Sequence, residues 1–146
     1  GLKAKKIPLL FILGRQTNLS LFNNLNLGLR YNATGGGFNQ TTGIMNPEFN
    51  LFENNESVKS NVPGFPPFAV PFGTFGYKDR SQIMVFQQIG SVNTEQPLIC
   101  FNDEANNRYG FFTGEGFWRW RLLDFERNNN QNVTNDLICK SIQYLE

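Results

Sequence analysis

A continuous apolar run near the start of the chain, Ile7 to Leu13, constrains the fold more than any other feature. The run has no polar alternation, so it predicts a strand covered on both faces, as in a parallel sheet. Gly14 stops the run, and the apolar residues from Leu19 to Leu25 then recur at helical spacing. Thr17 or Asn18 is the expected N-cap of that helix. The pattern predicts a strand, a tight turn and a short helix, which is half of a β-α-β unit.

The next part of the chain carries weaker secondary-structure signals. Arg30–Gln40 is small, polar and glycine-rich, which predicts an exposed loop. Thr41–Asn46 is a short strand in this interpretation, and Pro47 opens one helical turn. Val62–Tyr77 contains the densest proline cluster of the chain, and neither a helix nor a ladder strand tolerates that spacing. We therefore expect an extended strap that covers the sheet.

The second half of the chain predicts an antiparallel meander followed by two helices. In chain order these segments are Gln82–Ile89, Pro97–Phe101, Tyr109–Thr113, Phe117–Arg127 and Val133–Leu145. The length of 146 residues suits one domain, 1–146, with a core of its own. The expected fold class is α/β, with a mixed sheet that contains the Ile7–Leu13 strand inside it and helices packed on its faces.

Histidine is absent from the chain, and this restricts its chemistry. Without imidazole the chain cannot by itself assemble a Ser-His-Asp or Cys-His-Glu triad, or any histidine-containing zinc site. Cys100 and Cys139 are too few for a structural metal centre, so we expect no metal and no other cofactor. Both lie in apolar contexts that favour buried thiols, and a disulfide would require an oxidising compartment.

Charge and hydropathy narrow the range of partners. Thirteen basic and twelve acidic residues give a net charge of +1, without the concentrated basic face of a nucleic-acid-binding protein. No apolar run approaches the roughly 20 residues of a membrane helix, so direct membrane insertion by this segment is not expected.

A Gly-Glu-Gly-x-Trp-Arg-Trp-Arg motif lies within Gly114–Leu145, ahead of a helix that ends in Gln-Tyr-Leu. This stretch resembles the closing segment of the class I glutamine amidotransferase-like domain of large bacterial membrane-anchored proteins. Segments similar to the same family are LLFILGRQTNLSLFNNLNLGL (9–29), NPEFNLF (46–52), FPPFAVPFG (65–73) and FQQIGSVNTEQPLICF (86–101). The resemblance implies a partial flavodoxin-like three-layer fold, of which this chain is the later part, in a soluble segment of a membrane-anchored parent protein.

The resemblance also implies where catalysis would occur. Active members of the class carry a cysteine nucleophile at the sharp turn after the strand, here Leu13–Thr17, and a His-Glu pair further on. This chain has Gln16 at that place, and a carboxamide cannot form the thioester. We therefore expect a catalytically silent module that acts in binding or assembly. Two alternatives stay open: a hydrolase or amidotransferase completed by segments outside the chain, with Glu115 or another acid as general base, and a small-ligand sensor at the turn.

Two segments supply the candidate ligand-binding residues. The turn lies at the carboxyl end of a predicted parallel strand, where open α/β sheets bind ligands. The tryptophan-arginine motif is a candidate recognition patch at the same sheet edge. The alternatives are an ordinary capped turn and a packing motif, in which the tryptophans cover the core and the arginines hold the loop. The candidate residues are Arg15, Gln16, Thr17, Asn18, Glu115, Trp118, Arg119 and Arg121.

The expected partners follow from the same interpretation. They are another protein or the rest of the parent chain. A strand that lacks its preceding β-α-β units should leave an open sheet edge, which predicts self-association into a homo-oligomer.

Overall fold

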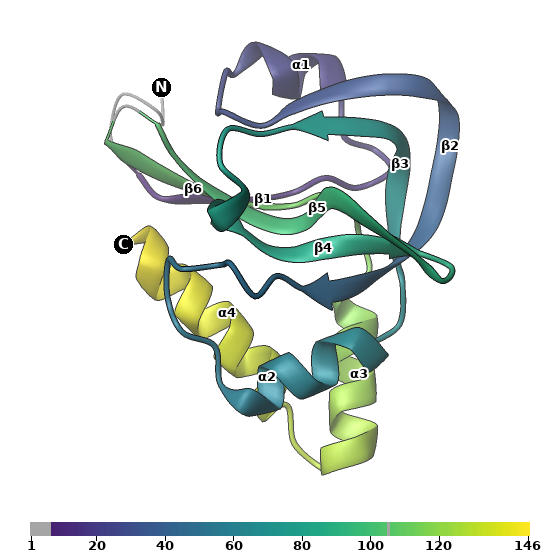
Figure 1. Cartoon of the computed structure of the whole chain (residues 1–146), viewed down its shortest axis with the longest axis vertical. Coiled ribbons are helices and arrows are strands. Elements are labelled where there is room, and N and C mark those ends of the chain that lie inside the picture. Colours follow the sequence, from purple (N-terminus) through teal and green to yellow (C-terminus); the bar gives the residue numbers. More distant parts are fainter. Residues whose placement is uncertain (1–6, 105) are drawn as a thin grey trace.

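The computed structural model describes residues 7–104 and 106–146, which form a curled six-stranded sheet with helices on two sides (Figure 1). The strand order is β1-β6-β5-β4-β2-β3. The strands are β1 (Leu9–Ile12), β2 (Arg30–Met45), β3 (Phe68–Gly76), β4 (Ile83–Ile89), β5 (Val92–Glu104) and β6 (Asn107–Phe112). The helices are α1 (Leu19–Asn24), α2 (Glu56–Asn61), α3 (Phe117–Asn128) and α4 (Asn132–Leu145), with short 3-10 turns at Val62–Gly64 and Arg80–Gln82.

The sheet is mixed, because β1 runs parallel to β6 while the other neighbouring strands are antiparallel. Helices α2, α3 and α4 gather on one side of the sheet and α1 lies on the opposite side (Figure 1). The prediction of an α/β domain with a mixed sheet and flanking helices is therefore confirmed. The antiparallel meander β4-β5-β6 and the two C-terminal helices also form where the sequence predicts them.

Strand β1 forms within the predicted apolar run, but at the edge of the sheet rather than inside it. Phe11 packs on Phe22 of α1 and on Phe111 of β6, with ring centroids 5.9 and 5.7 Å apart. The side chain of Ile12, which points to the other face, is 53% exposed. The expectation of a strand inside the sheet and covered on both faces is therefore wrong, because an apolar run does not report how many neighbours a strand has.

The predicted loop Arg30–Gln40 is wrong as well, since these residues belong to the long strand β2. The pairing of β2 with β3 shifts register between Ala33 and Phe38, across the glycines. Gly35 and Gly37 have φ values of +146° and +101°, a backbone conformation that suits a bulge. Cross-strand pairing therefore overrides the low strand propensity of this segment.

The proline-rich strap is also a ladder strand for much of its length. Phe68–Gly76 forms β3, which pairs antiparallel with β2 and places Pro71 opposite Phe38. An outermost strand tolerates proline because one side of its backbone needs no ladder hydrogen bond. At Pro47 the chain makes a turn, closed by a hydrogen bond from Phe49 N to Asn46 O, rather than a helix.

The outer edge of β3 contacts the segment that continues β6. Ala69 and Glu115 exchange two backbone hydrogen bonds of 2.8 and 3.1 Å in an isolated antiparallel bridge. The sheet curls, so that β3, at one end of the strand order, meets the residues that follow β6 near the other end. Among the described residues β1 then pairs with β6 alone, and its outer edge stays open.

The buried face of helix α3 contacts both the sheet and α4. Trp120 and Asp124 are both fully buried on this face. The Asp124 carboxylate accepts hydrogen bonds from the backbone N–H of Thr134 (3.0 Å) and from its hydroxyl (3.2 Å). Thr134 lies in the first turn of α4, so Asp124 satisfies an N–H group that the helix itself leaves free. No helix among the described residues is long and apolar enough to cross a membrane.

Candidate functional site

The turn after β1 is held by local hydrogen bonds. Thr17 N donates to Gly14 O (3.1 Å), and the Thr17 hydroxyl accepts from Gly14 N (2.9 Å). Asn18 caps α1 by accepting from Leu21 N (3.0 Å), so the predicted cap and helix are confirmed. The side-chain oxygens of Thr17 and Asn18 therefore accept hydrogen bonds from the backbone of the turn and of α1.

An open hollow of about 470 Å³ lies over this turn. Arg15, Gln16 and Thr17 line it together with Glu115, which the bridge to Ala69 holds beside the end of β1. The structure therefore brings together four of the residues that sequence patterns single out. Ile12 and Gly14 complete the lining.

The charges in this hollow belong to one ion pair. Arg15 Nε lies 3.2 Å from Glu115 Oε1, and the two side chains are 54% and 43% exposed. The carboxylate approaches so closely that a Cβ at Gly14 would lie 2.7 Å from Glu115 Oε2. The Arg15 guanidinium also lies 5.6 Å from the centre of the Phe38 ring. A half-exposed pair of this kind contributes only about 0–1 kcal/mol, so it can exchange partners with a polar ligand.

The remaining members of the tryptophan-arginine motif do not line this hollow. Arg119 donates to Pro67 O (3.3 Å) and lies 5.2 Å from the Trp118 ring. Arg121 donates to Asn135 Oδ1 (2.9 Å) on α4. The two arginines thus connect α3 to the segment before β3 and to α4, as a packing motif would.

The two tryptophans of the motif have opposite surroundings. Trp120 is fully buried, whereas Trp118 is 60% exposed on the outer face of α3. The packing interpretation, in which both tryptophans cover the core, is therefore correct for Trp120 and wrong for Trp118. The helical repeat places residues two positions apart on different faces, so one of the pair must turn outward.

Neither cysteine lies in the hollow over the turn. Cys100 is buried in β5, and burial raises the pKa of its thiol. Cys139 is exposed on α4, so the expectation of two buried thiols is wrong for this residue. Both thiols are free. In the described part of the chain, no group of three or more Cys, Asp or Glu side chains is arranged to hold a metal ion.

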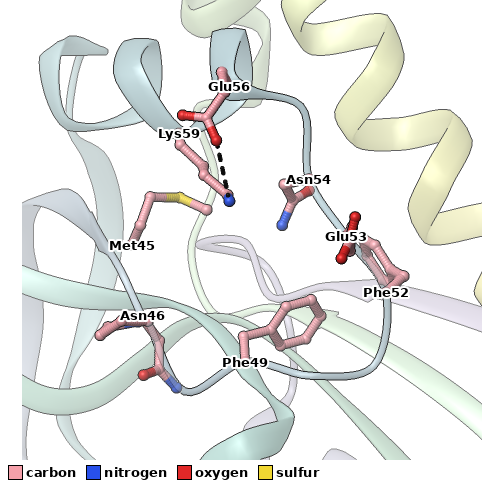
Figure 2. Close-up of a pocket in the computed structure, with 9 residues that line it drawn as sticks. Met45, Asn46, Phe49, Phe52, Glu53, Asn54, Glu56 and Lys59 are labelled. Carbon is pink, nitrogen blue, oxygen red and sulfur yellow. Dashed lines mark hydrogen bonds and ion pairs between the residues drawn. The ribbon is translucent and has the colours of Figure 1, made fainter.

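A second hollow, of about 530 Å³, lies between the loop that follows β2 and helix α2 (Figure 2). Apolar side chains form one part of its wall, and charged and amide side chains form the rest. Sequence reasoning missed this site, although the segment FNLFENNESVK (49–59) interleaves aromatic, amide and charged residues. The residues that matter here are Met45, Phe49, Phe52, Glu53, Asn54, Glu56 and Lys59.

Comparison of the chain with family models, with curated proteins and with solved structures finds no match. Any function assigned to this chain therefore depends on the geometry of its own residues, and above all on the two hollows.

Proposed function

We propose that this chain is a catalytically silent module of the class I glutamine amidotransferase-like kind, with a partial flavodoxin-like three-layer fold, and that it acts in binding or assembly. The observation that carries the proposal is the composition of the hollow over the turn. Its charged groups, Arg15 and Glu115, form an ion pair, and Gln16 occupies the place where the resemblance puts a nucleophile.

Covalent glutamine hydrolysis needs a thiolate and a base that activates it. Cys100 is buried in β5 with a raised pKa, which disfavours its thiolate form, and it does not line the hollow. Cys139 lies on α4 and does not line the hollow either. The Glu115 carboxylate is engaged in an ion pair with Arg15. These features support a role in reversible binding.

An open sheet edge supports the assembly part of the proposal. Among the described residues β1 hydrogen-bonds to β6 alone, and Ile12 is 53% exposed beside that edge. An unpaired strand edge with an exposed apolar side chain is a template for pairing with another strand. The partner would be a strand of the parent protein or of a second copy of this chain.

The catalytic part is tested by measuring ammonia release from glutamine by the purified chain. We expect background release for the unaltered chain and for the double variant Cys100→Ser, Cys139→Ser. Turnover that survives replacement of both cysteines would refute the proposal. If the variant Glu115→Gln then abolished that turnover, Glu115 would be the general base of a hydrolase.

The assembly part is tested by sedimentation velocity between about 1 and about 100 µM, a range that reveals concentration-dependent association. We expect self-association, which the variant Ile12→Lys weakens by placing a charge at the open edge. Val92→Lys is the matched control, because Val92 is 63% exposed and lies at the start of β5, where it pairs with Ile89 of β4. A monomer at every concentration would contradict assembly through a second copy.

A further inference from the structure

The hollow between the loop after β2 and α2 has a preformed apolar wall. Phe49 and Phe52 lie edge to face, with ring centroids 5.0 Å apart, and Phe52 packs on Phe101 at 5.5 Å and on Tyr144 at 5.9 Å. Met45 adds a further apolar side chain. Because the rings are supported from behind, the wall does not need to form when a ligand arrives.

The loop that carries the polar part of the lining is tied to α4. Lys140 Nζ donates to the backbone carbonyl of Glu53 (2.9 Å), and Asn55 Nδ2 donates to Asp136 Oδ2 (2.8 Å). These contacts hold the residues on either side of Asn54. The Glu53 carboxylate takes no part in them, so it remains available at the rim of the hollow.

Asn54 has an unused hydrogen-bond acceptor. Its Oδ1 is buried and has no hydrogen-bond partner among the described residues. In Figure 2 the amide lies at the hollow with its nitrogen toward the centre. The amide nitrogen thus faces the hollow, whereas Oδ1 is closed off from it, so Asn54 reports on binding at this hollow but does not accept a hydrogen bond from a ligand.

The charged groups of the lining favour a cation. Glu56 and Lys59 form an ion pair at 3.4 Å on α2. The Glu53 carboxylate forms no ion pair with a described residue, so the lining carries one more carboxylate than ammonium groups. The nearby rings of Phe49 and Phe52 also attract cations through their negative faces.

We propose that this hollow binds a primary ammonium group carried on a short apolar chain, either a free alkylamine or the side chain of lysine. The ammonium donates to the Glu53 carboxylate, while the methylene groups pack on Phe49, Phe52 and Met45. This inference is independent of the proposed function, because it uses a different hollow and no residue of the turn after β1.

The test is a nuclear magnetic resonance titration of the whole ¹⁵N-labelled chain with three probes of equal length: hexylammonium, hexanol and hexanoate. We expect hexylammonium to bind with a Kd on the order of 1 mM and to shift the Asn54 side-chain amide signals. Hexanol should bind about tenfold more weakly, and hexanoate should cause no shift at this site. Equal or tighter binding of hexanoate, or shifts confined to other regions, would overturn the proposal.

A fourth probe, N-acetyl-lysine methylamide, separates the two sources of the ammonium. Binding of this probe supports recognition of lysine side chains, and binding of hexylammonium alone supports a free amine. Absence of binding by both probes at about 10 mM would overturn the proposal.

Variants assign the binding to individual groups. Glu53→Gln should weaken hexylammonium binding about five- to tenfold, because it removes the free carboxylate and keeps the backbone carbonyl that Lys140 contacts. Glu126→Gln is the matched control on α3 and should leave binding unchanged. If Glu53→Gln bound the amine as well as the unaltered chain does, the charge argument would fail.

Discussion

Replacing Trp120 by alanine tests whether the tryptophan-arginine motif is mainly a packing device. The Trp120 ring is fully buried, stacks on Phe68 with centroids 4.6 Å apart and packs on Phe65 at 5.1 Å. Its indole N–H donates to the carbonyl of Pro66 at 2.7 Å. The substitution therefore opens a cavity and leaves a backbone acceptor without its donor.

The expected loss of stability follows from these two effects. Truncation of a buried tryptophan to alanine costs about 3–5 kcal/mol, and an unsatisfied carbonyl adds about 1 kcal/mol. We expect Trp120→Ala to lower the free energy of unfolding by about 5 kcal/mol, a large part of the 5–15 kcal/mol typical of a domain. Trp120→Phe keeps an aromatic ring and loses the hydrogen bond, so we expect a loss of about 2 kcal/mol.

Urea unfolding followed by far-ultraviolet circular dichroism measures the free energy of unfolding of both variants without relying on tryptophan fluorescence. In a thermal unfolding experiment with the same signal, at about 2–4 °C per kcal/mol, the Tm of Trp120→Phe should fall by about 4–8 °C. Trp118→Ala is the control within the same motif, since Trp118 is 60% exposed, and its unfolding free energy should change by less than about 0.5 kcal/mol. Should Trp118→Ala destabilise the chain as much as Trp120→Phe does, the reasoning from burial would be refuted.

Two further predictions concern buried polar and thiol groups. Asp124→Ala should lower the free energy of unfolding by about 3 kcal/mol in a urea titration, because it removes the acceptor for Thr134 at the start of α4. Glu126→Ala, an exposed neighbour on α3, should change it by less than about 0.5 kcal/mol, and equal losses would contradict the capping role. In the folded chain a thiol-specific disulfide reagent at pH 8 should modify Cys139 and spare Cys100, whose thiol is buried with a raised pKa. Modification of both thiols at the same rate would show that β5 opens readily.

The segments that the sequence predicted correctly carry their signal within a short stretch of chain. Apolar spacing at helical period identified α3 and α4, and Asn18 marked the start of α1. The meander β4-β5-β6 follows from β-prone runs separated by polar residues. In these elements local propensity and tertiary packing favour the same structure.

The segments that the sequence predicted wrongly depend on partners far away in the chain. The glycines of β2 and the prolines of β3 each argue against a strand, but each segment supplies the ladder partner that the other needs. The position of β1 at the edge depends on how many strands pair beside it, which no local pattern records. Strand pairing is a long-range property, so only the assembled sheet decides it.

The candidate sites divide in the same way. The sequence by itself determined which chemistry is missing, since the absence of histidine and the glutamine at position 16 can be read directly. Tertiary structure alone decided which groups meet: the bridge between Ala69 and Glu115 brings the Glu115 carboxylate to Arg15, and the loop after β2 lines one hollow with Glu53 and the aromatic wall. Residue types limit the reactions that a chain can perform, whereas a site requires distances that only the folded backbone sets.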